Sequence, residues 1–195
     1  MKENLFATIK SFGHLTKEEA AAFLKITREV QIAKHDCLLR PGQQAEHIHF
    51  VVQGGFRSYF IKDGEEITDY FFFEQTFATD YVSLFGDKPT EFYLEAIEDS
   101  QTLAYKRRAF LQLAKEYPVF GDFGRIHAER AFVEIEERMR ILQHQSLQEK
   151  YEYTIEKFPQ LFQRAPQHQI ASYLGVKPES LSRIKRGKKS GKSTS

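Results

Sequence analysis

The sequence predicts an α+β chain in which an N-terminal sandwich or barrel of short strands with a helical cap, called the roll below, is followed by one long helix and a small all-α unit. Three observations predict this order. Apolar residues recur with helical spacing up to about Arg28, with short alternating runs from there to Arg107, and with helical spacing again afterwards. Glycine-containing turns separate the short runs, and a pair of short helices surrounds Gly175 near the end. At 195 residues and 41% hydrophobic composition, the chain can bury one substantial core and add a small second domain.

The first 27 residues are predicted to be helical, because Thr16 and Glu19 have the spacing of a capping box at the start of an apolar stripe. Seven short strand-like runs follow: VQI, CLL, IHFVV, FRSYFI, EITDYFFF, YLEAI and QTLAYK. Turn signals between them are Pro41-Gly42, Gly54-Gly55, Asp63-Gly64, and Gly86 with Pro89. Many short strands at nearly regular spacing predict a sandwich or barrel, and the helices before them are expected to cover its end.

Helical periodicity returns over residues 107–117 and then continues in one long helix over residues 118–143. A seam of apolar residues at steps of four and three follows that helix: Ala128, Phe132, Ile135, Met139 and Leu142. A second apolar face carries Ile126, Val133 and Ile141. One interpretation is that the helix only packs on its own roll. The presence of two apolar faces favours a second interpretation, in which one face packs on the roll and the seam forms a parallel homodimer.

A further helix over residues 147–158 leads to the stretch 167–186, which is predicted to be a helical hairpin. Ile170 and Leu174 of its first helix face Leu181 and Ile184 of the second. Gly175 stands where the tight turn requires a positive φ. Pro166 and Pro178 are expected at the first positions of the two helices, where a proline loses no internal hydrogen bond.

Charge distinguishes this hairpin from an ordinary polar helix pair. From Arg164 onward there are eight Lys and Arg residues against the single acid Glu179, so the segment carries +7 and the preceding residues −6. Such a concentration of positive charge is typical of phosphate binding, and a short polar helix fits the major groove of DNA. The residues expected to contact DNA are Gln167, His168, Lys177, Glu179, Ser180, Ser182, Arg183, Lys185 and Arg186.

Other functions receive less support. The single cysteine, Cys37, cannot form an internal disulfide, and no apolar run approaches the ~20 residues of a membrane span, so a cytoplasmic protein without membrane contact is expected. His47 and His49 alternate on one strand and are expected on one face, yet no third ligand has a suitable spacing, so no metal site is expected. An enzyme on a cupin-like barrel is disfavoured because no nucleophile–base constellation stands out, and no cofactor is evident.

The order of helical cap, glycine-punctuated roll, seam helix and helical hairpin, with LLRPGQQAEHIHFVVQGGFRSYF early and GVKPESLSRIKR late, resembles the Crp–Fnr regulators over essentially the whole chain. The resemblance implies that the strands form an antiparallel β-roll, a double-stranded β-helix of the cyclic-nucleotide-binding-like kind. It also implies a homodimer through the long helix and a helix-turn-helix that reads a palindromic DNA site. Glu179 and Arg183 match two base-reading positions of the family. The resemblance also implies a transcription activator, with RNA polymerase as a candidate partner.

The effector cassette departs from the family's pattern. Members that bind cyclic AMP have a cassette with a Glu for the ribose and an Arg for the phosphate. The corresponding stretch here is FATDYVSLFGDKPTEFYLEA. Thr79 and Thr90 stand near the positions of that Glu and Arg, and Glu91 adds a negative charge. A phosphate buried without this Arg would be an unpaired charge, so binding of cyclic AMP in the family's usual mode is not expected. The residues proposed for a small-molecule effector pocket are Arg57, Thr79, Asp80, Tyr81, Lys88 and Thr90.

The predicted division is an effector roll over residues 1–117, a dimerisation helix over 118–144, and a helix-turn-helix domain over 145–195. The family's β-strand wing is expected to be reduced or absent, and the basic end GKKSGKSTS is expected to be disordered and available for DNA phosphates. The alternative function is a small-molecule sensor or protein-binding module without productive specific DNA binding.

Overall fold

The computed structural model describes residues 5–6, 8–9 and 14–191. Contacts divide the chain into two compact units. The first comprises the chain up to Phe60 together with Tyr70–Ala131, and the second comprises Ile61–Asp69 together with the chain from Phe132 onward. The three-part division expected from the sequence stays a prediction.

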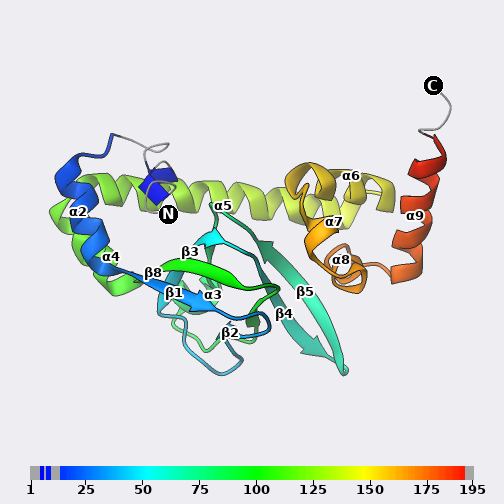
Figure 1. Cartoon of the computed structure of the whole chain (residues 1–195), viewed down its shortest axis with the longest axis horizontal. Helices are drawn as coiled ribbons and strands as arrows, with labels where there is room; N and C mark the ends of the chain where they lie inside the picture. The colour runs from blue at the N-terminus through cyan, green and yellow to red at the C-terminus, as the bar shows by residue number, and fades with distance from the viewer. Residues whose placement is uncertain (1–4, 7, 10–13, 192–195) are drawn as a thin grey trace. The chain divides into compact units, whose positions relative to one another are not determined.

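The roll consists of two four-stranded sheets (Figure 1). The strand order in one sheet is β1 (Thr27–Ile32), β8 (Ser100–Lys106), β3 (His47–Gln53), β6 (Phe77–Ala78). In the other sheet it is β2 (Cys37–Leu39), β7 (Tyr93–Ala96), β4 (Phe56–Lys62), β5 (Glu65–Phe72). β8 pairs antiparallel with both β1 and β3, and β7 pairs antiparallel with both β2 and β4. The predicted antiparallel α+β roll is therefore confirmed, with β6 as the short strand that the sequence did not indicate.

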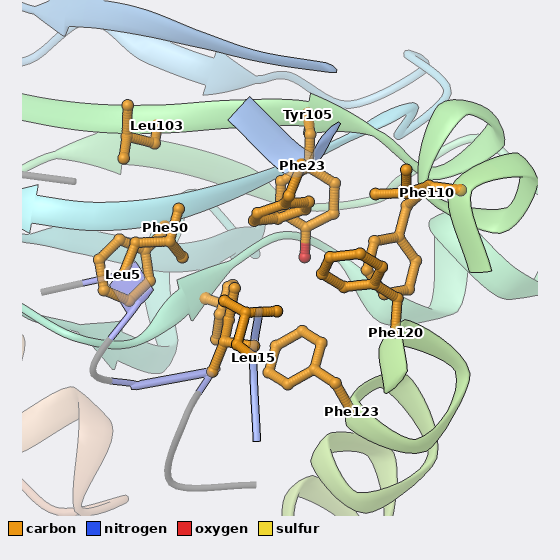
Figure 2. Packing of buried hydrophobic residues seen from close by; sticks show 12 residues of the cluster. Leu5, Leu15, Phe23, Phe50, Leu103, Tyr105, Phe110, Phe120 and Phe123 are labelled. Atoms are coloured by element: carbon orange, nitrogen blue, oxygen red, sulfur yellow. The ribbon is translucent and has the colours of Figure 1, made fainter. Parts of the chain in front are cut away.

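Helices cover one face of the first sheet. They are α2 (Lys17–Ile26), α4 (Arg107–Glu116) and the beginning of α5 (Pro118–His144). The predicted capping box starts α2, since the Glu19 N–H donates to Thr16 Oγ1 at 3.2 Å and the Thr16 N–H donates to the Glu19 carboxylate at 2.8 Å. Phe23 is fully buried, and its ring packs against Tyr105, Phe110 and Phe120 with centroids 5.2–6.1 Å apart (Figure 2). Aromatic burial of this kind holds the helical cap on the sheet.

A second core fills the space between the two sheets. Alternation along β3 explains how both cores form from the same strand, because Phe50 points to the helical cap and Val51 to the roll interior. Phe56 and Leu94 contribute to the interior from the second sheet. The same alternation directs His47 and His49 to the side of Val51.

Gly54 sits in a turn that no other residue fits without strain. Its φ is +92°, and a Cβ built there lies 2.7 Å from the Cα of Ser100, whose hydroxyl accepts the N–H of Gly55 at 3.1 Å. We expect Gly54→Ala to destabilise the roll by about 2–4 kcal/mol, because backbone strain and overpacking add. Gly64→Ala is the matched control, since φ is +83° there but nothing lies within 4 Å of the added Cβ. We expect that control to cost about 1–2 kcal/mol. Urea-unfolding midpoints measure both, and equal losses would show that contact with Ser100 is unimportant.

The second unit contains the end of α5 and four short helices: α6 (Leu147–Lys157), α7 (Leu161–Arg164), α8 (Gln167–Tyr173) and α9 (Pro178–Gly191). The predicted helical hairpin is α8–α9, with Gly175 at φ +68° in its turn. Pro178 is the first residue of α9 as predicted. Pro166 was predicted at the first position of α8 but is its N-cap, one residue earlier, with an extended ψ of 146°. α7 was not predicted, because four residues are too few for a periodic pattern.

Residues Ile61–Asp69, at the tip of the β4–β5 hairpin, belong to this second unit through contacts that join them to α5 and α8. The N–H of Thr68 donates to Ser172 Oγ at 2.9 Å, and the same hydroxyl donates to the carbonyl of Glu66 at 3.1 Å. The guanidinium of Arg138 donates to the carbonyl of Asp69 and stacks 3.9 Å over the ring of Tyr173. These contacts join residues that are 35 to 106 positions apart in the chain, so local sequence patterns do not indicate them.

No β-strand follows Lys106 in the part of the chain that the structure describes, which agrees with the expected reduction of the wing. α9 continues to Gly191. The start of the basic end, expected to be disordered, is therefore helical through residue 191, and residues 192–195 lie outside the described range. Across the described residues, none of the helices has the length and apolar character needed to cross a membrane.

Candidate effector cavity and candidate DNA-reading helices

The roll contains a cavity of about 430 Å³ on the side of β2 and β3. Its lining residues are Leu38, Leu39, Gln43, Gln44, Ala45, Glu46, His47, His49, Thr79 and Leu94. The two histidines share this face as their alternation predicted, with ring centroids 6.1 Å apart. Among the described residues no group of three or more His, Cys, Asp or Glu side chains is arranged to hold a metal ion.

Both imidazoles are held in the neutral form at pH 7. His49 is 7% exposed, and its Nδ1 lies 3.1 Å from the hydroxyl of Thr102. Burial, with smaller contributions from His47 and Arg28, lowers the pKa of His49 to about 4. Burial also lowers the pKa of His47, and the positive charges of Arg28 and Lys106 add to that effect. The cavity therefore presents imidazole nitrogens without a net positive charge.

The cassette beside the cavity is stabilised by its own hydrogen bonds. Asp80 caps α3 (Tyr81–Gly86) by accepting the N–H groups of Val82 and Ser83 at 2.9 and 3.2 Å. Its second carboxylate oxygen accepts the hydroxyl of Thr90 at 2.5 Å. Thr79, which lines the cavity, donates its hydroxyl to the carbonyl of His47 at 2.9 Å. Thr79, Asp80 and Thr90 thus serve the folding of the cassette, and Asp80 and Thr90 are not among the cavity-lining residues.

The other residues proposed for the pocket from sequence also lie away from the cavity lining. Arg57 is 2% exposed on β4, with its guanidinium 3.9 Å over the ring of Tyr59. Lys88 is exposed in the loop after α3. The hydroxyl of Tyr81 lies 2.9 Å from Nε2 of His127 on α5, and this link between the cassette and the long helix was not predicted. The sequence did indicate the two histidines through their alternation, but it gave no signal for Gln43 and Gln44.

The α8–α9 hairpin exposes five of the nine residues proposed to contact DNA: His168, Lys177, Glu179, Arg183 and Arg186. Glu179 and Arg183 lie one helical turn apart on α9. The other four are partly buried, and three of them, Gln167, Ser182 and Lys185, make side-chain contacts within the unit. Gln167 Nε2 donates to Ser182 Oγ and, at 3.2 Å, to the carbonyl of Pro178, which ties α8 to α9. Lys185 lies 5.4 Å from the ring centroid of Phe162.

The predicted seam of α5 is largely uncovered in the single chain. Phe132, Ile135 and Met139 are 64%, 56% and 43% exposed, Ala128 is exposed, and Leu142 is half-buried. Val133, on the second apolar face of the helix, is 53% exposed. Contiguous exposed apolar side chains of this size mark a surface that another molecule covers.

Comparison with known proteins agrees with this architecture. Residues 29–117 match the family model of the cyclic nucleotide-binding domain. FixK2 from Bradyrhizobium japonicum has 18% identity and a TM-score of 0.71, covering 83% of this chain and 84% of that chain. The catabolite activator protein of Thermus thermophilus has 20% identity and a TM-score of 0.57, with 90% and 84% covered. CLP, described as a c-di-GMP-responsive global regulator of Xanthomonas campestris, has 12% identity and a TM-score of 0.68, with 90% and 93% covered. No curated protein matches the sequence.

Residues 29–117, which hold most of the roll, therefore match the cyclic nucleotide-binding domain family. The chain as a whole has the fold of the Crp–Fnr regulators, as the resemblance of its sequence implied.

Proposed function

We propose that this protein is a homodimeric transcription regulator that binds a palindromic DNA site through α8 and α9 and carries a small-molecule-sensing roll. The exposed pair Glu179 and Arg183, one turn apart on α9 in a segment of charge +7, carries the proposal. Arg donates two hydrogen bonds to guanine O6 and N7, and Glu accepts from cytosine N4, so the pair suits a G·C-containing half-site.

Dimerisation follows from the exposed seam of α5. A two-fold dimer presents two α9 helices, so the two half-sites are expected about one helical turn of DNA apart. The resemblance of the sequence to the Crp–Fnr regulators implies the same arrangement and makes RNA polymerase a proposed partner, and the fold shared with the Thermus catabolite activator protein agrees with that resemblance. The lone Cys37 suits a reducing compartment such as the cytoplasm.

A DNA mobility-shift assay over a salt series tests the proposal. Specific binding to a selected palindrome is expected to persist at salt concentrations that abolish binding to unrelated DNA. Salt weakens the contacts to phosphates, which both DNAs offer, but it weakens hydrogen bonds to base edges much less. Equal loss on both DNAs would instead favour a sensor or protein-binding module without specific DNA recognition.

The effector is proposed to differ from cyclic AMP. Thr90, which falls near the position of the family's phosphate-binding Arg, is a neutral residue whose hydroxyl donates to the carboxylate of Asp80. An unpaired phosphate placed there is repelled by that carboxylate. We expect calorimetry to detect no micromolar binding of cyclic AMP, and a micromolar dissociation constant would contradict this account of the cassette.

A further inference from the structure

The cavity of the roll contains two glutamines whose orientation is fixed by contacts at one end of each amide. Gln43 Oε1 accepts the N–H of Arg40 at 2.8 Å. Gln44 Nε2 donates to the carbonyl of Ser83 at 2.5 Å. The other ends, Gln43 Nε2 and Gln44 Oε1, have no protein partner among the described residues, and both side chains are exposed at the mouth of the cavity, where water can be exchanged for a ligand. One hydrogen-bond donor and one acceptor are therefore available to a molecule in the cavity.

The two histidines add a second such pair. Nε2 of His47 lies 3.4 Å from the guanidinium of Arg28, which can only donate, so the neutral His47 ring carries its proton on Nδ1. Nδ1 of His49 is engaged by Thr102, and within the described part of the chain its Nε2 is bonded to nothing. Nδ1 of His47 thus adds a further donor. Nε2 of His49 donates or accepts a hydrogen bond according to which ring nitrogen carries the proton.

The rest of the lining disfavours an ion. Leu38, Leu39 and Leu94 form an apolar wall. The one lining carboxylate, Glu46, is already paired with Lys106 at 3.0 Å. No lysine or arginine lines the cavity to pair with an anion. Arg28 and Lys106 contact the lining residues His47 and Glu46 but do not line the cavity themselves. An ion held against the leucine wall would therefore lose hydration without a direct opposite charge, which costs several kcal/mol.

We propose that this cavity binds an uncharged small molecule that carries a primary carboxamide, or an equivalent paired donor and acceptor, on an apolar body. A volume of about 430 Å³ lies within the range of ordinary small-molecule sites. The proposal deepens the sensing role given above to the roll and rests on that proposed function. It identifies the chemical class of effector from the atoms that are left to bind it.

Matched probes of the same shape test this class directly. Calorimetry and NMR titration of the full-length protein compare benzamide and nicotinamide with benzoate and nicotinate, which replace the amide NH₂ by a charged oxygen. We expect the amides to bind in the millimolar range or better, to shift the ring resonances of His47 and His49, and to bind at least about tenfold more tightly than the acids. The absence of amide binding at millimolar concentration, or equal binding of the acids, would overturn the proposal.

Two glutamine substitutions localise the site. Gln43→Glu keeps the oxygen that accepts the Arg40 N–H but replaces the free donor with an acceptor and adds a negative charge. We expect it to weaken amide binding by about tenfold, the effect of roughly 1.4 kcal/mol. Gln53→Glu makes the same change at an exposed position outside the cavity lining and is expected to leave amide binding unchanged. Equal effects of the two variants would place the amide site elsewhere.

DNA binding is measured on the same preparation without any probe. If the amides fail to bind while specific DNA binding persists, only the assigned ligand class is wrong. If the amides bind as expected but specific DNA binding is absent, the cavity proposal stands and the regulator function falls.

Discussion

Replacing Ile135 and Met139 together by glutamate is expected to convert the dimer to monomers and to weaken binding to a two-half-site DNA by more than about a hundredfold. The two side chains are 56% and 43% exposed in the single chain, so a partner has apolar surface left to cover. Burying a large apolar side chain contributes about 1.5–3 kcal/mol, and a two-fold interface contains four of them. The substitution removes that contribution and places like charges beside the symmetry axis. A hundredfold loss requires only about 2.7 kcal/mol.

Sedimentation equilibrium measures the oligomeric state, and circular dichroism checks that the helices remain. Val133→Glu is the control, because Val133 is 53% exposed on the same helix but lies outside the seam. We expect that variant to remain dimeric. A double variant that also remains dimeric would mean that the chains associate through another surface.

Replacing Arg183 by alanine is expected to cost about 1–3 kcal/mol per half-site, and therefore about 2–6 kcal/mol for the dimer on its palindrome. The side chain is exposed on α9 one turn after Glu179, and we propose that it makes a bidentate contact to guanine from there. Sequence preference is expected to flatten at one base pair of each half-site. Selection of bound sites from a random DNA pool, with the parent and with the variant, measures this directly.

Lys177→Ala is the matched control for readout. Lys177 is exposed in the turn before α9, where we expect its ammonium group to contact a phosphate, a contact that carries no sequence information. We expect this variant to weaken all DNA sequences alike and to lower the slope of the salt dependence by about one. If Arg183→Ala selects the same consensus as the parent, Arg183 contacts a phosphate and not a base.

Local chemistry explains why much of the fold was predictable. The capping box of Thr16 and Glu19 involves a separation of three residues, and the turns at Gly54 and Gly175 follow from the freedom of glycine to adopt positive φ. The strands were recognised by alternation with period two. The helix pair that carries Glu179 and Arg183 was found in the same way, from apolar spacing and from the charge of its segment.

The limits of sequence reasoning are clearest in the cassette. Thr79, Asp80 and Thr90 were proposed as effector contacts because of where they fall in the chain. The structure uses the Asp80 carboxylate to cap α3 and to accept the Thr90 hydroxyl, and only Thr79 reaches the cavity. Residue type and position indicated that the region matters, but not which partner each polar group bonds.

The sequence by itself determined the elements, their order and the surfaces that carry charge or apolar side chains, because each depends on residues within a few positions of one another. Only the tertiary structure decided that Gln43 and Gln44 share a cavity with His49, that Tyr81 meets His127, and that Ser172 bonds the backbone of Thr68. Such contacts join residues that are far apart in the chain. They depend on strand register and on how helices dock, and a shift of one residue in a strand turns every side chain to the opposite face.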